Sequence, residues 1–256
     1  MLKAVSLFIA FVATTYVTAY SRTYNFTSTG DNFYCEFDTT GNICTIINYE
    51  GPLSGGPYYV LNNGIFTLPN KVGDGLAKYT VTNFGNGTQN VFCKSSGALQ
   101  YPEVTEENFP ASLAVIAANC SSGLPYLQAV YWSGTTPPSI GQNAFSDCPE
   151  LAYVGPSATP PSGPSTIRRY SIGDSAFEGC KKLKTVILKN GLTKIGRRAF
   201  AGCKNLKTIN IPRTVTEIAD DAFVDSGLRY VVLSRGQAPV SWIPRNVKVR
   251  IVEEGR

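Results

Sequence analysis

The sequence predicts an α/β solenoid, a coil of short repeats with a parallel β-sheet on one face and short helical or 3-10 turns on the other. Two observations predict it. An apolar block recurs at a spacing of 23 residues, and the apolar positions inside it alternate where a strand is expected. The 256-residue chain is also 43% apolar, with 24 Gly and 16 Pro. This composition is typical of a folded protein with many turns and few long helices.

The repeat is clearest in residues 172–188 and 195–211, which align without gaps. Both follow the pattern Ile-Gly-x-x-Ala-Phe-x-Gly-Cys-Lys-x-Leu-Lys-Thr. Shorter or less regular copies begin at Ile218, Ile140, Ile116 and Phe84. Matched blocks of this kind do not arise by chance, so the chain is expected to be built from stacked repeats.

Each repeat is expected to form one coil. The pattern Leu183-x-x-Val186-x-Leu188 alternates as a short strand does, and Ala199-Phe200 is assigned to the helical or 3-10 turn on the opposite wall. One coil of about 23 residues has too few apolar side chains to offset the conformational entropy lost on folding. Coils must therefore stack, so that equivalent residues of successive copies become neighbours.

The remaining segments predict a leader and two end caps. Residues 1–19 resemble a cleaved signal peptide, with Lys3 ahead of an apolar stretch too short to span a membrane. The other boundaries are residues 20–65 for an N-terminal β-hairpin cap that turns about Thr40-Gly41, residues 66–235 for the repeats, and residues 236–256 for a C-terminal cap strand. The mature chain is therefore expected to be secreted or extracellular, without a membrane span, and held at a cell surface only by a partner.

The repeated block resembles the BspA-type leucine-rich repeat family, whose members are extracellular and surface proteins. The resemblance is strong over residues 139–233 and fainter over about 66–130. It implies a short leucine-rich repeat coil and a role in adhesion, through binding of host proteins, matrix proteins or other cells. The family motif is structural, so the resemblance transfers no functional residue.

The composition argues against an enzyme. The chain has no histidine, which excludes Ser-His-Asp and Cys-His catalysis, and it has no glycine-rich phosphate-binding motif. We expect no catalytic residue, metal or cofactor. The predicted function is an extracellular recognition or adhesion module for a protein or an anionic glycan. The alternative is a structural coat or matrix protein that associates with itself, and nucleic acid is not an expected partner of an exported chain.

The predicted ligand face is the outer side of the strands, because the x positions of L-x-x-L-x-L point away from the core. It comprises Tyr131, Tyr153, Thr185, Ile187, Thr208, Asn210, Tyr230 and Val232. Aromatic and apolar side chains at these positions suit a protein partner. The same residue types also favour strands whether or not they bind anything.

A second predicted surface is basic, since residues 181–207 contain nine Lys or Arg and no acid. Stacking is expected to gather one patch from Lys181, Lys182, Lys184, Arg197, Arg198, Lys204, Lys207 and Arg229. Such a patch attracts sulfated glycans or acidic surfaces. The other interpretation is a solvated face that only aids solubility.

The seven cysteines fall into two groups. Cys148, Cys180 and Cys203 recur at one repeat position and are expected to form a buried stack of free thiols. Two disulfides are predicted among the others, Cys35 with Cys44 and Cys93 with Cys120. The candidate glycosylation sites, each at the start of an Asn-x-Ser/Thr triplet, are Asn25, Asn86 and Asn119.

Overall fold

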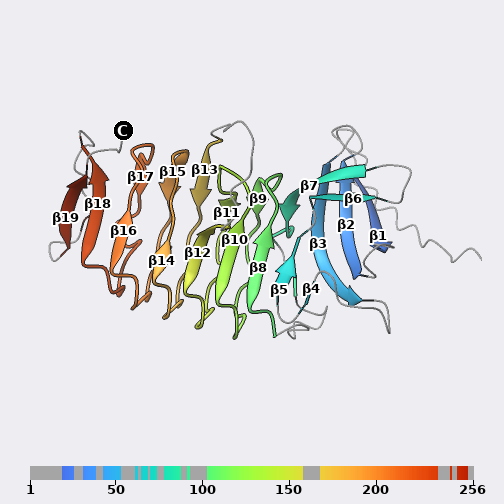
Figure 1. Cartoon of the computed structure of the whole chain (residues 1–256), viewed down its shortest axis with the longest axis horizontal. Coiled ribbons are helices and arrows are strands. Elements are labelled where there is room, and N and C mark those ends of the chain that lie inside the picture. Colours follow the sequence, from blue (N-terminus) through green and yellow to red (C-terminus); the bar gives the residue numbers. More distant parts are fainter. Residues whose placement is uncertain are drawn as a thin grey trace, which may run out of the picture.

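The molecule is a series of short strands that lie side by side along its long axis (Figure 1). The computed structural model describes residues 19–25, 31–38, 43–52, 61–62, 65–68, 70–73, 78–87, 91–92, 103–157, 168–235, 243 and 247–252. In this part of the chain the secondary structure consists of strands and turns, without a helix. Residues 1–18 of the predicted signal peptide lie outside the described residues.

One wall of the solenoid, wall A, is a ten-stranded sheet. Its strands in spatial order are β1 (Ala19–Asn25), β2 (Asp31–Asp38), β3 (Ile43–Pro52), β7 (Lys78–Phe84), β9 (Val115–Ile116), β11 (Ser139–Ile140), β13 (Tyr170–Ile172), β15 (Leu192–Ile195) and β17 (Glu217–Ile218), with β6 (Lys71–Gly73) beside β7. From β3 to β17 the neighbours in this order pair in parallel. Wall A therefore runs the length of the repeats.

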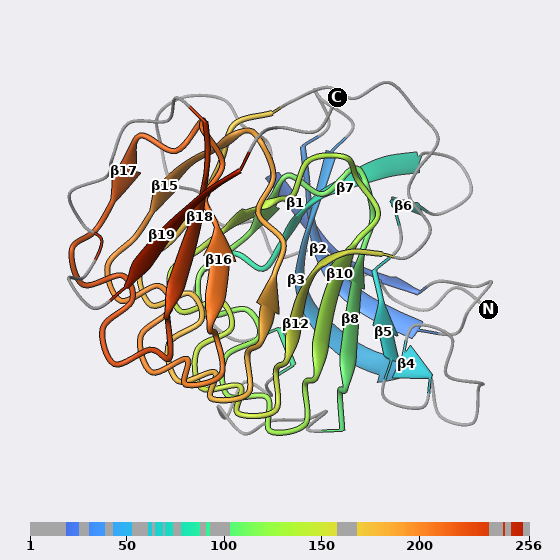
Figure 2. The ribbon, with the colours of Figure 1, turned by 60° about the vertical axis from the view of Figure 1, so that its left-hand side comes forward.

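The second wall, wall B, contains the L-x-x-L-x-L strands. Its six-stranded sheet has the order β4 (Leu61–Asn62), β5 (Ile65–Thr67), β8 (Glu106–Phe109), β10 (Ala129–Trp132), β12 (Tyr153–Pro156) and β14 (Thr185–Val186). A three-stranded sheet of β16 (Thr208–Asn210), β18 (Tyr230–Ser234) and β19 (Lys248–Val252) continues it. Figure 2 shows these strands side by side, with β15 and β17 on another side of the molecule.

The prediction that the copies stack in register is confirmed. Phe84 pairs with Ile116, Ile116 with Ile140, and Ile140 with Ile172. The row continues through Ile195 and Ile218. The three leucines that open the strand motif, Leu183, Leu206 and Leu228, are all buried. The row includes Phe84, so the in-register stack of strands begins upstream of residue 116.

The α/β assignment is wrong, because the segment that carries Ala-Phe is a turn and not a helix. The four copies that begin at Ile116, Ile140, Ile172 and Ile195 each have two residues with positive φ, four positions apart, such as Ser175 and Gly179 or Arg198 and Gly202. A right-handed helix cannot continue through such residues. The backbone instead bonds to the next coil, as where the Phe177 N–H donates to Ala199 O at 2.8 Å. The sequence also predicted a sheet on one face only, whereas the structure has sheets on both walls.

A ladder of stacked phenylalanines fills the core behind these turns. The rings of Phe145, Phe177, Phe200 and Phe223 follow one another with centroids 5.5, 5.4 and 5.3 Å apart and planes within 10° of parallel. The glycine of Ile-Gly permits this spacing. A Cβ on Gly173 would lie 2.7 Å from the carbonyl carbon of Gly141, and one on Gly196 equally close to that of Gly173.

The predicted thiol stack is confirmed. Cys148, Cys180 and Cys203 are free, fully buried, and donate to carbonyls of a preceding coil, for example Cys203 Sγ to Phe177 O at 3.1 Å. Burial raises the pKa of the Cys148 and Cys203 thiols to about 12. These thiols therefore stay protonated and act as small apolar side chains.

Both disulfide predictions are wrong, because Cys44 and Cys120 are free cysteines buried in the core. Cys120 Sγ donates to Phe84 O at 3.0 Å, which fixes the thiol inside the core. In the antiparallel pair of β2 and β3, Cys35 lies opposite Ile46, and Cys44 lies opposite Phe37. The two cysteines are thus not directly across from each other.

The two ends of the solenoid are strands. The antiparallel pair of β2 and β3 leads into wall A, where β3 pairs with β7. The turn expected at Thr40-Gly41 lies outside the described residues. The strand expected at residues 247–252 is β19, which pairs in parallel with β18. That these elements close the core as caps stays a prediction.

Candidate functional site

The outer surface of wall B consists of two rows of side chains. In the first row Glu106 pairs with Ala129, Ala129 with Tyr153 and Tyr153 with Thr185. Six of the eight predicted ligand-face residues are half-buried, and Thr208 and Asn210 are exposed. The inward neighbours Val130, Val154, Val186 and Ile209 are buried. The predicted residues therefore lie on one outer face, and their role in binding stays a prediction.

Two tyrosines form a contact in the middle of this face. The rings of Tyr131 and Tyr153 lie 5.3 Å apart at 36° to each other. The Tyr153 hydroxyl donates to Pro156 O at 3.1 Å, so the ring extends along its own strand over Gly155. A Cβ on Gly155 would lie 2.5 Å from that hydroxyl oxygen. Gly155 thus provides the space that holds this tyrosine pair in place.

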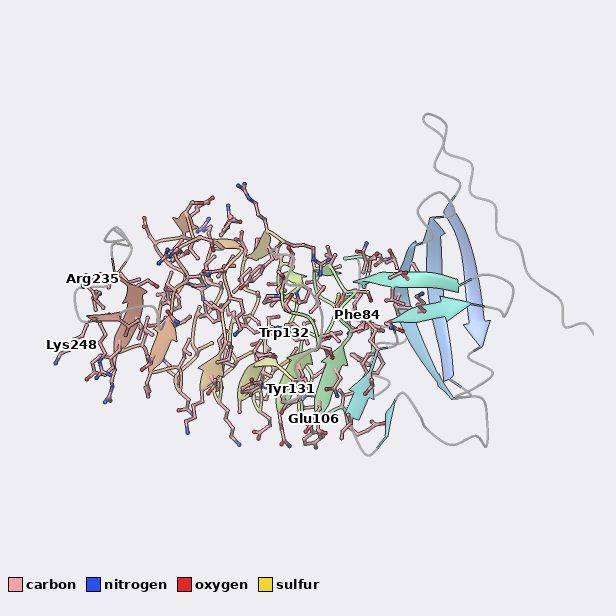
Figure 3. The ribbon with its side chains drawn as sticks, turned by 45° about the horizontal axis from the view of Figure 1, so that its top comes forward. Phe84, Glu106, Tyr131, Trp132, Arg235 and Lys248 are labelled. Atoms are coloured by element: carbon pink, nitrogen blue, oxygen red, sulfur yellow. The ribbon has the colours of Figure 1, made fainter. Side chains whose placement is uncertain are left out.

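Partial burial and the neighbouring ring of Tyr131 raise the pKa of Tyr153. Tyr153 stays neutral at physiological pH, and the pair presents aromatic surface with fixed orientation. Figure 3 shows Tyr131 on the same side of the molecule as Glu106, far from Lys248. Tyr230 differs from the pair, since the guanidinium of Arg250 lies 3.9 Å from its ring centroid and covers it.

The predicted basic patch is divided in two. Arg197 and Arg198 come after β15 of wall A and Gly196, and they form ion pairs with Asp221 and Glu178, respectively. The hydrogen bond from Arg198 lowers the pKa of Glu178. The other six residues lie on turns before β14, β16 and β18 of wall B, and one of them, Lys182, forms an ion pair with Glu150. The remaining five are Lys181, Lys184, Lys204, Lys207 and Arg229.

The buried acid Glu107 was not predicted from the sequence. Glu107 lies on the inward row of wall B between Phe66 and Val130, and is fully buried. Burial raises its pKa to about 8, and the nearby Ser121 hydroxyl offsets part of this rise. Its alignment with Val130 could have revealed an acid at a core position. At neutral pH Glu107 is mainly a neutral acid inside the core.

The candidate glycosylation sites differ in accessibility. Asn119 Nδ2 donates to Gly87 O at 3.4 Å, and its Oδ1 accepts from Asn143 Nδ2 at 3.2 Å. The Ser121 that completes the triplet is buried. Packing between coils therefore occupies the amide that a glycan would need. Asn86 is exposed, and the side chain of Asn25 lies outside the described residues.

Residues 94–226 match the BspA type leucine rich repeat region in six copies, which is about half of the chain. The chain belongs to this family. Family membership implies a role in protein interaction or adhesion in general. A comparison with curated proteins gives no match.

Several solved bacterial structures are similar to this BspA-type chain. A leucine rich cell surface protein of Faecalibacterium prausnitzii is 26% identical, with 82% of this chain and 54% of that chain covered and a TM-score of 0.47. The leucine rich repeat protein of T. pallidum is 19% identical, with 86% and 78% covered and a TM-score of 0.47. A leucine-rich repeat protein of Eubacterium ventriosum is 18% identical, with 88% and 53% covered and a TM-score of 0.48. The BspA-type chain spans about half the length of the first and the third.

The candidate functional features of this BspA-type chain are the tyrosine pair and the basic residues of wall B. Over the described ranges, no helix has the length and apolar character that a membrane crossing requires. No three His, Cys, Asp or Glu residues of the same ranges gather as a metal site.

Proposed function

We propose that this BspA-type protein is a non-enzymatic, secreted or surface-located recognition module that binds a protein partner through wall B, with Tyr131 and Tyr153 as the anchor. The observation that carries the proposal is the tyrosine pair, which is half-buried, in mutual contact, and held by the hydrogen bond to Pro156 O. Tyrosine is enriched among the residues that dominate binding energy in protein interfaces. A tyrosine already fixed in one rotamer loses little entropy when it binds.

The surroundings of the pair support the same function. Asn108 lies opposite Tyr131, Thr185 lies opposite Tyr153 on β14, and Ile187 follows that strand. The pair is thus surrounded by polar and apolar side chains of moderate size, an arrangement common to the central part of protein interfaces. The outer face of the solenoid is rigid, because every strand is hydrogen-bonded to neighbouring coils.

The first prediction follows from this anchor. With proteins from cell-surface and matrix extracts as the ligand, the double variant Tyr131→Ala/Tyr153→Ala should bind at least about thirtyfold more weakly than the unchanged protein. The measurement is saturable binding by biolayer interferometry at several extract dilutions. Circular dichroism and the urea midpoint check that the variant folds.

The control is Tyr126→Ala, which removes a tyrosine that is 57% exposed on the turn before β10, outside the tyrosine pair. It should bind as the unchanged protein does. If the double variant keeps full binding, or if the Tyr126 variant loses as much, the tyrosine pair is not the anchor. Absence of saturable binding to every extract contradicts the recognition function itself.

A further inference from the structure

Three cations occupy the same position in three successive coils of wall B. Lys184, Lys207 and Arg229 each stand directly before their strands, β14, β16 and β18. We call these three residues the cation ladder. All three are exposed, and the Arg229 N–H donates to Lys207 O at 2.9 Å, which fixes the register of the last two. With strands about 4.8 Å apart, the ladder spans about 10 Å along the solenoid axis.

The acids of these coils do not neutralise the ladder. The four ion pairs of the described residues involve Lys182, Lys194, Arg197 and Arg198, and none involves a ladder residue. Lys207 Nζ donates to a backbone carbonyl, that of Lys204, which holds its ammonium close to the coil without removing its charge. The ladder is therefore a row of cations that a ligand can still neutralise.

Among the described residues, the outward positions beside the ladder carry no acid either. The outward residues from β14 to β18 are Thr185, Ile187, Thr208, Asn210, Tyr230 and Val232. The next strand adds Lys248 and Arg250, both exposed and in register with Tyr230 and Val232. The half of wall B that contains Tyr131 has Glu103 and Glu106 instead. The outer face thus changes from acidic to basic along the axis.

We infer that the cation ladder binds a linear anionic glycan that lies along the solenoid axis and crosses β14, β16 and β18. A ligand that meets all three cations must run across the strands and must have negative charges at intervals of a few ångströms. The hydroxyls of Thr185 and Thr208 and the amide of Asn210 can hydrogen-bond to sugar hydroxyls next to the charges. The glycan site adjoins the tyrosine pair at Thr185, which lies opposite Tyr153, but its three cations belong to other coils than the two tyrosines.

The same surface does not suit single-stranded nucleic acid. Such ligands gain much of their affinity from bases that stack on exposed aromatic rings. Among the described outward residues from β14 to β19, the aromatic side chain is that of Tyr230, and Arg250 covers its ring. Charge without a stacking surface favours the sulfated or carboxylated sugar.

The second prediction tests the ladder with a heparin-derived sulfated oligosaccharide as the probe. The triple variant Lys184→Gln/Lys207→Gln/Arg229→Gln should bind it at least about tenfold more weakly, because three exposed ion contacts are lost. The triple variant Lys189→Gln/Lys194→Gln/Arg213→Gln loses the same charge outside wall B and should bind within about twofold of the unchanged protein. Affinities are measured by isothermal titration calorimetry at two salt concentrations, since the contact is screened.

Tyr131→Ala/Tyr153→Ala should keep heparin binding, so failure of the tyrosine anchor and failure of the ladder are distinguishable. Equal losses in the two triple variants would mean that net charge alone attracts the probe and would overturn the inference. So would the absence of saturable heparin binding, or equal affinity for single-stranded DNA of the same charge.

Discussion

Replacement of Phe177 by alanine is expected to lower the free energy of unfolding by about 3–5 kcal/mol, the range for a buried phenylalanine. The ring is fully buried and stacks on Phe145 at 5.5 Å and on Phe200 at 5.4 Å. Its loss therefore leaves a cavity between two coils and removes two aromatic contacts together. Urea unfolding followed by circular dichroism measures the change.

Phe177→Leu is the matched control. It retains apolar volume but breaks the ring stack, so its loss should be clearly smaller than that of the alanine variant. Tyr126→Ala removes a mostly exposed ring and should change stability by less than about 1 kcal/mol. A loss below about 1 kcal/mol for Phe177→Ala would show that the phenylalanine ladder does not hold the coils together.

The stability of the unchanged protein is expected to fall as pH rises from about 4.5 to about 8, because of Glu107. Burial raises the pKa of this acid from 4.5 to about 8. Over that range the folded chain keeps the proton and the unfolded chain releases it, so the folded state loses relative stability with each pH unit. At about 1.4 kcal/mol per pH unit, the whole fall is on the order of 5 kcal/mol.

Glu107→Gln should flatten this profile, since glutamine stays neutral at every pH. The measurement is the urea unfolding free energy at pH 5, 6.5 and 8 for both proteins. Glu106→Gln changes the adjacent acid, which faces outward and is half-buried, and should leave the fall in place. Parallel profiles for the unchanged protein and Glu107→Gln would contradict the assignment of a neutral acid to the core.

The stacked repeats were predictable because each apolar position recurs in sequence. The row from Ile116 to Ile218 and the buried Leu183 and Leu206 follow directly from the spacing. Wall A was not predicted as a sheet, because β9, β11 and β17 have two residues each and cannot display alternation. Strands this short exist only because neighbouring coils pair with them.

The prediction of helical turns was wrong for a local reason. Gly179 and Gly202 signal left-handed backbone, but Asn143, Ser175 and Arg198 adopt it without a glycine. One of the two positions that break the helix therefore could not be predicted from residue type. The Cys35–Cys44 disulfide prediction failed because the register of β2 and β3 sets Cys35 opposite Ile46 and Cys44 opposite Phe37. The spacing of two cysteines on either side of a turn does not fix that register.

The candidate site was predictable in outline only. Spacing placed Tyr131 and Tyr153 on one face, but the ring contact depends on Gly155, whose role appears only when Tyr153 is seen to lie over it. Spacing likewise grouped Arg197 and Arg198 with the ladder residues. Their ion pairs with Asp221 and Glu178 place them at the wall A end of the turn.

The stacking of equivalent residues can be tested by cross-linking. Thr208 and Tyr230 pair across β16 and β18, so mild oxidation of Thr208→Cys/Tyr230→Cys should form an intramolecular disulfide that peptide mass spectrometry detects. Thr185→Cys/Tyr230→Cys places the thiols two coils apart, about 10 Å, and should not cross-link. Cross-linking of the second pair but not the first would contradict the in-register solenoid, and with it the outer face of wall B.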